Sequence, residues 1–539
     1  MTEKYTAEQL EAIEKKEVIK LFLANQEQME MMLDAMNQLT EQLRIANQYR
    51  FGRHTEKLEA ISGQLNLFDE ADALYDEDVP EPDIEEIIPP TPRKKRPKGK
   101  RDLDLDGLDQ EEILHSVSKE TLDSFYGSGN WKKMPDDIYR KLRYEPASWT
   151  VEIHMVEVYV GTDGDHQDEF MRGERPKDLL QKSLLSPSLG AAIINGKYVN
   201  SLPLNRIEQE FGRNGINISR QDMSNWMINI SKRYFVPFCE RMKEELFKYH
   251  VNQADETPLQ VINDGKSPGS KCWMWVHRSG EFYTDKPIVL YEFQKGRDHH
   301  FPLEYYKDFK GVLETDALQQ YHLIEKKSPG IINANCWVHA RRDYADAIKA
   351  MPKDNPEAMK QSIAYQALRR ISTIFDLEGA LKSLSPEERL KERQATIKPL
   401  VDEYFTWVKE NVSKVLPKGK TADGLNYSIN QEKYLRVFLD DGEVPIDNSA
   451  SERAIRTFCI GKKNWLFCNT ENGAESSALI YSVTETAKLN NLKPYAYLNH
   501  ILTELPKLCD DDGNIELSKL DPLMPWSSEL PEECRKLRR

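Results

Sequence analysis

After Tyr249 the residue pattern changes from helix-like to strand-like, and this change limits the folds that the chain can adopt. Strand-like and helix-like segments then follow in order: strands at 250–262, 271–278 and 286–293, a helix at 299–309, a strand at 311–318, and a strand leading into a helix at 331–351. Residues 355–440 are charged and helical, and residues 447–489 form a compact helical pattern. We therefore predict an α/β core with a mixed sheet, interrupted by a helical insertion.

Length and composition exclude several classes of protein. A chain of 539 residues exceeds one ordinary domain, and 39% hydrophobic residues supply enough apolar mass for folded cores. No apolar run approaches the roughly 20 residues of a membrane-spanning helix, and the charged start shows no signal-peptide core. The seven cysteines have no paired spacing that indicates a disulfide framework or a zinc ribbon. We expect a cytoplasmic protein in a reducing compartment, with no membrane partner.

Residues 1–48 are expected to form one long helix with a heptad seam. The seam alternates at spacings of four and three residues and consists of Phe22, Gln26, Met29, Leu33, Met36, Thr40 and Leu43. Met is frequent along the seam, and its flexible side chain can pack against different partner surfaces, so the seam does not sharply specify one partner. One interpretation is a helix packed on its own domain. We favour self-association into a homo-oligomer, because no strand or second helix follows closely to cover the seam.

The net charge of −15 is distributed unevenly, which leaves room for a nucleic-acid partner. Residues 69–86 carry ten acidic and no basic side chains, and without them the charge would be −5. Residues 93–101 carry seven Lys or Arg, beginning with Arg93, Lys94, Lys95 and Arg96. Several prolines interrupt any helix here, which indicates a linker. The basic run either contacts DNA phosphates or is a solvated linker.

Residues 140–160 alternate between apolar and polar positions. Trp149, Val151, Ile153 and Met155 share one face, and the alternation continues on a shifted register from Val156. This pattern predicts a strand or hairpin.

The pattern that follows predicts two helices joined by a turn. Residues 204–211 and 218–230 have helical patterns, and two glycines lie in the turn at 212–215. Ser219 can cap the second helix, whose exposed Arg220 and Gln221 can then reach into a DNA major groove. Two packed helices without DNA are the alternative.

Three acidic residues occupy informative places in the α/β core. Asp255 follows the first strand-like run, Asp316 ends the fourth, and Glu452 begins the last helix, where Arg456 can orient it. Carboxylates at strand ends can converge, and clustered carboxylates need a divalent cation to remain ionised together. Two such ions can activate water and stabilise the leaving oxygen of a phosphodiester. Each residue also has a plain interpretation as a turn or cap residue, with Glu452 completing a capping box with Ser449.

The segments around these carboxylates resemble the DDE transposases of insertion-sequence family sixty-six, the TnpC type. The resembling strings are FGRHTEKL at 51–58, ADETP at 254–258, ETDALQQY at 314–321, CWVHARRDYADA at 336–347, and the long, highly specific string at 447–498. The resemblance covers about residues 51 to 526, including the C-terminal segment with LMPW.

This resemblance implies an RNase H-like fold and a metal-dependent enzyme. Its triad falls on Asp255, Asp316 and Glu452, which would bind two Mg²⁺, with Mn²⁺ as a substitute. The enzyme would be a bacterial insertion-sequence transposase that cleaves element ends and joins the 3′-hydroxyl to target DNA, at the nucleoid. Accessory proteins of the same element are usual for the family. The alternatives are a catalytically inactive, transposase-derived DNA-binding protein and a helical assembly factor built around residues 1–48.

The chain departs from the family pattern in one module. Relatives commonly carry paired CxxC zinc ligands before the helix-turn-helix, whereas no Cys precedes Cys239 here. His154 and His166 cannot make a four-ligand site alone, so we expect no structural zinc. Cys336 and His339 are also too few for a metal, and we favour a packed thiol and a positioned imidazole near the active site.

Four further cations are candidate DNA contacts. Arg341 and Arg342 open a helix after the fifth strand, and Lys462 and Lys463 follow Glu452. Given a DNA substrate, we favour contacts with the phosphate backbone. A salt-bridged helix surface and a solvated turn are the respective alternatives.

The predicted architecture is multidomain α/β. Its parts are an N-terminal coiled coil (1–50), an acidic then basic linker (51–105), a small β-containing module (106–175), a helix-turn-helix-like DNA-binding region (176–245), an RNase H-like DDE core (246–350 and 441–500), a helical insertion (351–440) and a C-terminal segment (501–539).

Overall fold

A computed structural model describes residues 148–160, 170–172, 176–266, 270–351, 356–510 and 512–536, together with positions 20, 22, 23, 26, 29, 32, 120 and 124. Residues 178–536 belong to one compact unit, and residues 148–160 and 170–172 belong to another. No helix within these described ranges is long and apolar enough to cross a membrane.

The N-terminal positions agree with a helix as far as they are described. Phe22, Gln26 and Met29 are helical and exposed, as is the neighbouring Met32. The other seam residues, the linker and the basic run lie outside the described residues, as do residues 106–119 of the β-containing module. The coiled coil therefore stays a prediction.

The smaller unit contains a short hairpin. Strand β1 (Val158–Val160) pairs antiparallel with β2 (Phe170–Arg172). The predicted strand over Trp149 to Met155 is wrong: these residues have no strand assignment, and Met155 is 89% exposed. Alternation makes a strand only where a second strand accepts its backbone hydrogen bonds, and among the described residues the pairing begins at Val158. The predicted hairpin is therefore confirmed for residues 158–160 alone.

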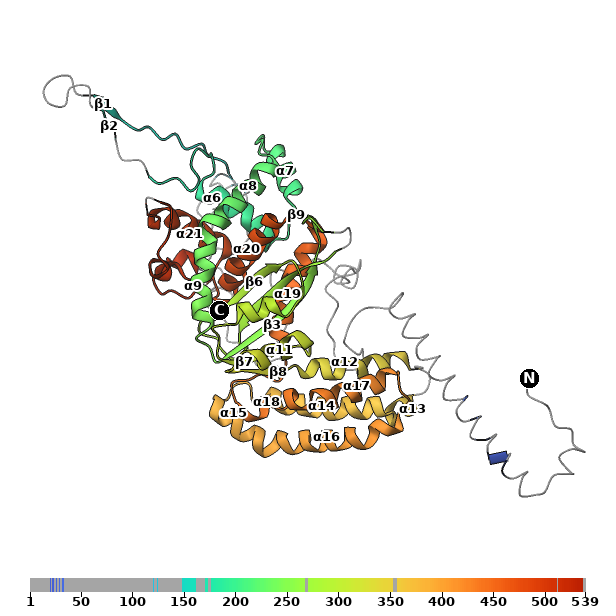
Figure 1. The fold of residues 1–539 in the computed structure, drawn as a ribbon. Coiled ribbons are helices and arrows are strands. Elements are labelled where there is room, and N and C mark those ends of the chain that lie inside the picture. Colours follow the sequence, from blue (N-terminus) through green and yellow to red (C-terminus); the bar gives the residue numbers. More distant parts are fainter. Residues whose placement is uncertain are drawn as a thin grey trace, which may run out of the picture. The chain divides into compact units, whose positions relative to one another are not determined.

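A five-stranded mixed sheet forms the centre of the larger unit (Figure 1). Its order is β6 (Val289–Gln294), β5 (Cys272–Ser279), β3 (Val251–Leu259), β7 (Gly311–Thr315) and β8 (Ile331–Asn335). The first three strands pair antiparallel, and β7 and β8 run parallel to β3. The predicted mixed sheet is therefore confirmed.

The helices between these strands also appear in the predicted order. Helix α10 (His300–Tyr305) precedes β7, α11 (Gln319–Lys327) precedes β8, and α12 (Trp337–Ala350) follows it. A second, two-stranded sheet joins β4 (Val261–Asn263) and β9 (Cys468–Thr470) in parallel, which the sequence did not suggest.

The start of β7 requires a glycine. Gly311 has φ +142°, and a Cβ at this position would lie 2.1 Å from the carbonyl oxygen of His250. The backbone N–H of Val312 donates to that same carbonyl at 2.8 Å. The missing side chain therefore allows β7 to lie directly against the start of β3.

Helices from both ends of the unit gather around the β6 side of the sheet (Figure 1). They are α6 (Pro187–Ile194), the π-helical turns η2 (Asn195–Val199) and η3 (Ser231–Phe235), α7 (Leu204–Arg213), α8 (Arg220–Ile230), α9 (Val236–Leu246), α20 (Glu471–Leu489), α21 (Pro494–Leu508), and the 3₁₀ turns η6 (Leu517–Leu523) and η7 (Glu532–Cys534).

Helix α20 covers the edge of the sheet with its side chains. Ser482 Oγ accepts from the backbone N–H of Tyr291 at 2.8 Å, and Thr486 Oγ1 accepts from that of Val289 at 3.1 Å. Thr486 also donates to the carbonyl of Val289 at 2.8 Å. The edge strand β6 is thus hydrogen-bonded to a helix instead of offering free groups to another chain.

Within its described residues, the predicted insertion contains helices and turns and no strand. It comprises α13 (Pro356–Gln361), α14 (Ile363–Ala380), α15 (Pro386–Glu392), the π-helical turn η4 (Arg393–Ile397), α16 (Lys398–Asn411), the 3₁₀ turn η5 (Val412–Lys414), α17 (Lys420–Leu435) and α18 (Val437–Asp440). Figure 1 shows these helices together beside α12 and β8. Trp337 and Tyr344 of α12 are fully buried in their shared core.

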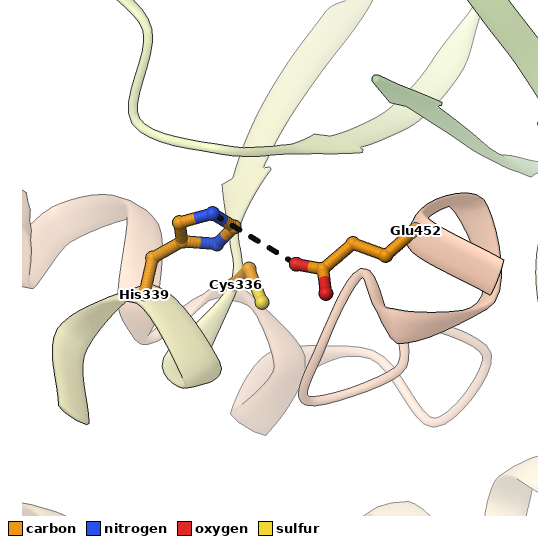
Figure 2. A group of neighbouring side chains, drawn as sticks. All are labelled: Cys336, His339 and Glu452. Carbon is orange, nitrogen blue, oxygen red and sulfur yellow. Dashed lines mark ion pairs between the residues drawn. The ribbon is translucent and has the colours of Figure 1, made fainter. Parts of the chain in front are cut away.

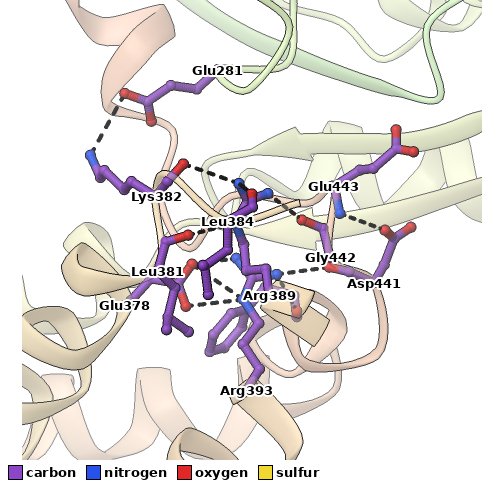
Figure 3. A network of polar contacts seen from close by, with 11 residues as sticks. Glu281, Glu378, Leu381, Lys382, Leu384, Arg389, Arg393, Asp441, Gly442 and Glu443 are labelled. Carbon is purple, nitrogen blue, oxygen red and sulfur yellow. Dashed lines mark hydrogen bonds and ion pairs between the residues drawn. The ribbon is translucent and has the colours of Figure 1, made fainter. Parts of the chain in front are cut away.

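Two buried arginines fasten the insertion to the segment that leads back to the core (Figure 3). Arg393 pairs with Glu378 and donates to the carbonyls of Phe438 at 2.7 Å and Asp441 at 2.8 Å. Arg389 donates to the carbonyl of Gly442 at 2.6 Å and to three carbonyls at the end of α14 and the turn after it. These contacts fix the segment 441–447, which runs directly into the next helix, α19 (Ser449–Trp465).

Candidate functional site

Asp255 and Asp316 share one face of the sheet on neighbouring strands. Strands β3 and β7 pair with Val251 opposite Val312 and Gln253 opposite Glu314. Side chains alternate along a strand, so two more residues in this register bring Asp255 level with Asp316, which directly follows β7. Asp255 lies within β3 and not after it, contrary to the prediction, because β5 pairs with β3 as far as Leu259.

Backbone donors hold both carboxylates in position. The N–H of Glu256 donates to Asp255 Oδ1 at 2.8 Å, and the N–H of Leu318 donates to Asp316 Oδ1 at 3.0 Å. Each carboxylate therefore has one oxygen oriented by its own chain segment.

Glu452 lies in the first turn of α19, and Asn448 attaches that turn to β3. The Asn448 side chain donates to the carbonyl of Ala254 at 2.8 Å and accepts from Ser451 Oγ at 2.8 Å. Asn448 is the N-cap residue, and its side chain makes no capping hydrogen bond. The capping-box interpretation with Ser449 is therefore wrong. Glu452 is instead carried on a helix start that is anchored beside Asp255.

The three carboxylates interact electrostatically. Burial raises the pKa of Asp255 well above its ordinary value, and the negative charges of Glu256, Asp316 and Glu452 raise it further. Burial also raises the pKa of Asp316, and the N–H of Leu318 and the charge of Arg297 partly offset this effect. Asp316 and Glu452 therefore lie close enough to Asp255 for their negative charges to act on it.

A layer of supporting groups lies on the opposite face of β3. Glu256 accepts from Arg297 at 2.6 and 2.8 Å and from the Tyr321 hydroxyl at 2.7 Å. The guanidinium of Arg297 also lies over the ring of Trp273, 4.6 Å from its centroid. These residues were not predicted from the sequence, although the alternation of strand side chains already implies that Glu256 faces away from Asp255.

His339 lies beside Glu452, as its position after β8 suggested. Its Nε2 atom is 3.8 Å from Glu452 Oε1 (Figure 2). Arg456, which was predicted to orient Glu452, is exposed. Burial, together with the charge of Arg342, lowers the pKa of His339 to about 3, so the imidazole is neutral. One donor atom each from Cys336, His339 and Glu452 lie within 4.8 Å of one another. Glu452 is thus a third potential ligand that lies far from Cys336 and His339 in the sequence.

The two predicted helices before the core are α7 and α8. Gly215 in the turn between them has φ +78°. Ser219 caps α8 as predicted, since its hydroxyl accepts from the N–H of Asp222 at 3.1 Å. Arg220 and Gln221 are exposed in the first turn of α8, and Glu208 of α7 accepts from the backbone N–H of Arg220 at 3.1 Å.

The other predicted DNA contacts have different environments. Arg342 in α12 is close enough to Asp316 for its charge to lower the pKa of that carboxyl, and Arg341 is half-buried. Lys462 donates to the carbonyl of Pro258 at 2.7 Å and so ties the end of α19 to β3. Lys463 is exposed, and both lysines lie in the last turn of α19 and not in a solvated turn. The basic residues from Arg93 to Arg96 lie outside the described residues.

Comparison with family models identifies the chain. The model described as Transposase IS66 family matches residues 182–476, and the IS66 C-terminal element matches residues 482–526. A third model, Transposase C of IS166 homeodomain, matches residues 38–113. The chain belongs to the IS66 transposase family, which confirms the resemblance seen in its sequence and supports a transposase role with DNA as partner.

Three relatives from Sinorhizobium fredii align with much of the chain. Uncharacterized protein y4qI is 28% identical over 67% of this chain and 66% of its own length. Uncharacterized protein y4hP is 24% identical over 78% of this chain and 75% of its own length, and y4jD is 24% identical over 66% and 69%. The chain spans about two thirds to three quarters of the length of these relatives, and their names state no activity.

Proposed function

We propose that this chain cleaves the phosphodiester at each end of an insertion sequence and joins the exposed 3′-hydroxyl to target DNA. The observation that carries the proposal is the environment of Asp255, a partly buried carboxyl whose pKa is raised by burial and by the charges of neighbouring acids, including Asp316 and Glu452. Such clustering is costly for a protein unless a cation offsets it. Membership of the family supports DNA as the substrate.

The sheet supports an RNase H-like core as the scaffold for this chemistry. Three consecutive antiparallel strands followed by two parallel strands, in the order β6-β5-β3-β7-β8, are what such a core requires. Asp255 lies on the central strand β3, Asp316 directly follows the parallel strand β7, and Glu452 lies on the helix that follows the insertion.

The donor set fits hard divalent cations. Asp255, Asp316 and Glu452 offer carboxylate oxygens, which Mg²⁺ prefers, so these residues would hold two Mg²⁺ with Mn²⁺ as a substitute. When bound, such ions activate the attacking water and stabilise the leaving oxygen. The protein's own contribution is to position the acids through Asn448 and the backbone N–H groups, and to place the positive charge of Arg342 near Asp316. That guanidinium is suited to neutralising a phosphate, whereas Arg297 is paired with Glu256 on the opposite face of β3.

Cleavage of a duplex that carries the element end tests the proposal. Glu452→Gln should lower Mg²⁺-dependent cleavage by several orders of magnitude while leaving the fold and DNA binding intact, because it removes a metal ligand. Glu475→Gln is the matched control: Glu475 is exposed on α20, and its variant should stay within roughly tenfold of the wild type, about 1.4 kcal/mol of barrier. Binding without any Mg²⁺-dependent cleavage by the wild type would instead support the inactive DNA-binding alternative.

The proposal also assigns two modes of DNA contact. The first turn of α8 would read base edges through Arg220 and Gln221, and the basic run at 93–101 would contact phosphates. Changing Arg220 or Gln221 to Ala should relax sequence preference, whereas neutralising the basic run should weaken binding to all sequences and reduce the salt slope. Identical effects of both changes on specific and random duplexes would refute the helix-turn-helix assignment.

A further inference from the structure

Two helix starts bring a thiol, an imidazole and a carboxylate to one point. Cys336 is the N-cap residue of α12 and His339 lies in its first turn, whereas Glu452 lies in the first turn of α19. Figure 2 shows the imidazole and the carboxylate pointing toward one another, with the sulfur of Cys336 beside them. One donor atom from each residue lies within 4.8 Å of the others. We propose that these three residues bind a divalent cation of the zinc class, at a site that shares Glu452 with the acidic triad.

The chemistry of the donors distinguishes this site from the proposed magnesium site. Thiolate sulfur and imidazole nitrogen select zinc-class ions, whereas Mg²⁺ takes oxygen ligands. Three protein ligands also match zinc sites that keep a fourth position open for water or a substrate oxygen. Only Glu452 belongs to both sets, so one ion would take Glu452 from the other.

The surroundings of the cluster are those of a prepared site. Cys336 is fully buried, and its sulfur accepts from the backbone N–H of Asn448 at 3.2 Å, which fixes the thiol relative to the start of α19. The Nδ1 atom of His339 is buried and has no hydrogen-bond partner among the described residues. A metal ion is one group that can satisfy such a buried ring nitrogen.

The local charges favour a cation on balance. Asp447, Glu314 and Glu452 are close enough to Cys336 for their negative charges to act on it. Arg342 opposes a cation, since its positive charge acts on His339. Burial raises the pKa of Glu314 well above its ordinary value, so Asp447 and Glu452 are the two carboxylates set against that guanidinium. Binding would replace the sulfur–hydrogen bond of Cys336 by a sulfur–metal bond, with the proton released to solvent.

The effect of this site on DNA cleavage rests on the proposed function. An ion of the zinc class that binds Cys336 and His339 would also occupy Glu452 and withdraw it from the magnesium set. Zinc should therefore inhibit Mg²⁺-dependent cleavage, and a chelator of zinc should restore it.

Cobalt substitution tests the site without any turnover. Co²⁺ added to the full chain should produce a sulfur-to-cobalt charge-transfer band that saturates at one equivalent and disappears when Zn²⁺ displaces the cobalt. Cys336→Ser should abolish the band, with circular dichroism used to verify the fold. Glu452→Gln should weaken cobalt binding by about tenfold or more.

Cys459→Ser is the matched control. Cys459 also lies on α19, but its sulfur contacts the Thr257 hydroxyl at 3.5 Å and is not part of the cluster, so its variant should retain the band. A wild-type chain without the band, or a band that persists in Cys336→Ser, would overturn the inference. The spectrum and the cleavage assay separate the two proposals. A cobalt band without Mg²⁺-dependent cleavage refutes only the proposed function, and cleavage without the band refutes only this site.

Discussion

Removal of the Arg393 guanidinium should destabilise the helical insertion strongly. The side chain of Arg393 is 0% exposed and that of its partner Glu378 is 3% exposed. Arg393→Met would leave the Glu378 carboxylate buried without its cation and would remove the donors to the carbonyls of Phe438 and Asp441. Breaking one side of a buried ion pair costs about 3–5 kcal/mol, and we expect a loss in this range.

A surface ion pair provides the control for this change. Lys433 pairs with Glu325 at 3.0 Å, and its side chain is 68% exposed. Solvent screens such a pair, so Lys433→Met should cost less than about 1 kcal/mol. The double change Arg393→Met plus Glu378→Met removes the uncompensated charge and should recover a large part of the loss caused by Arg393→Met alone.

Urea unfolding followed by circular dichroism measures these differences. A chain of this size can unfold in more than one step, so the comparison applies to the transition that includes the insertion. If Arg393→Met and Lys433→Met had the same small effect, the Arg393–Glu378 pair would not be desolvated. If the double variant were as unstable as Arg393→Met, the loss would come from the carbonyl contacts and not from the stranded charge.

Three further predictions concern stability and assembly. Without divalent cations, Asp255→Asn should stabilise the fold by about 0.5–2 kcal/mol at neutral pH. The folded-state pKa of Asp255 is raised, so ionisation of its carboxyl costs stability as pH rises through that pKa. The gain in urea midpoint should therefore vanish near the ordinary aspartate pKa, and a gain that did not change with pH would refute the cause. Gly442→Ala should destabilise the fold by about 1–3 kcal/mol in the same assay, since the new Cβ would lie 1.9 Å from the carbonyl oxygen of Pro386; an unchanged midpoint would refute this. Met29→Glu plus Leu33→Glu should yield a smaller species in sedimentation, and an unchanged mass would refute the coiled coil.

The sequence was sufficient to place Asp316 at the end of its strand, although it placed Asp255 after the first strand and not within it. Strand patterns located β3 and β7, and both Asp255 and Asp316 fall on the face that Gln253 and Glu314 occupy. A parallel register between two such strands brings these acids together without any knowledge of the helices. The compact pattern after residue 447 also predicted the start of α19, and with it the position of Glu452.

Contacts between distant segments were not predictable from local patterns. Strands β4 and β9 have three residues each, so neither carries a period long enough to detect. Ser482 and Thr486 look like ordinary helix residues until β6 lies beside them. Trp149 to Met155 show the opposite case, in which a clear alternation has no partner strand among the residues that the structure describes.

The predicted packed thiol and positioned imidazole agree with the structure, but the third member of the cluster around Cys336 was not predictable, for the same reason. Two ligands in one helical turn indicated a packed thiol and a positioned imidazole, because the third group lies far along the chain. Only the return of the chain through the insertion and the segment 441–447 brings Glu452 next to His339.

The most direct test of the proposed active site is anomalous diffraction from crystals of the chain grown with Mn²⁺ and a duplex carrying the element end. We predict two anomalous peaks about 4 Å apart, coordinated by Asp255, Asp316 and Glu452. Mn²⁺ bound elsewhere, or no peak within coordination distance of these three carboxylates, would contradict the assignment of the acidic triad.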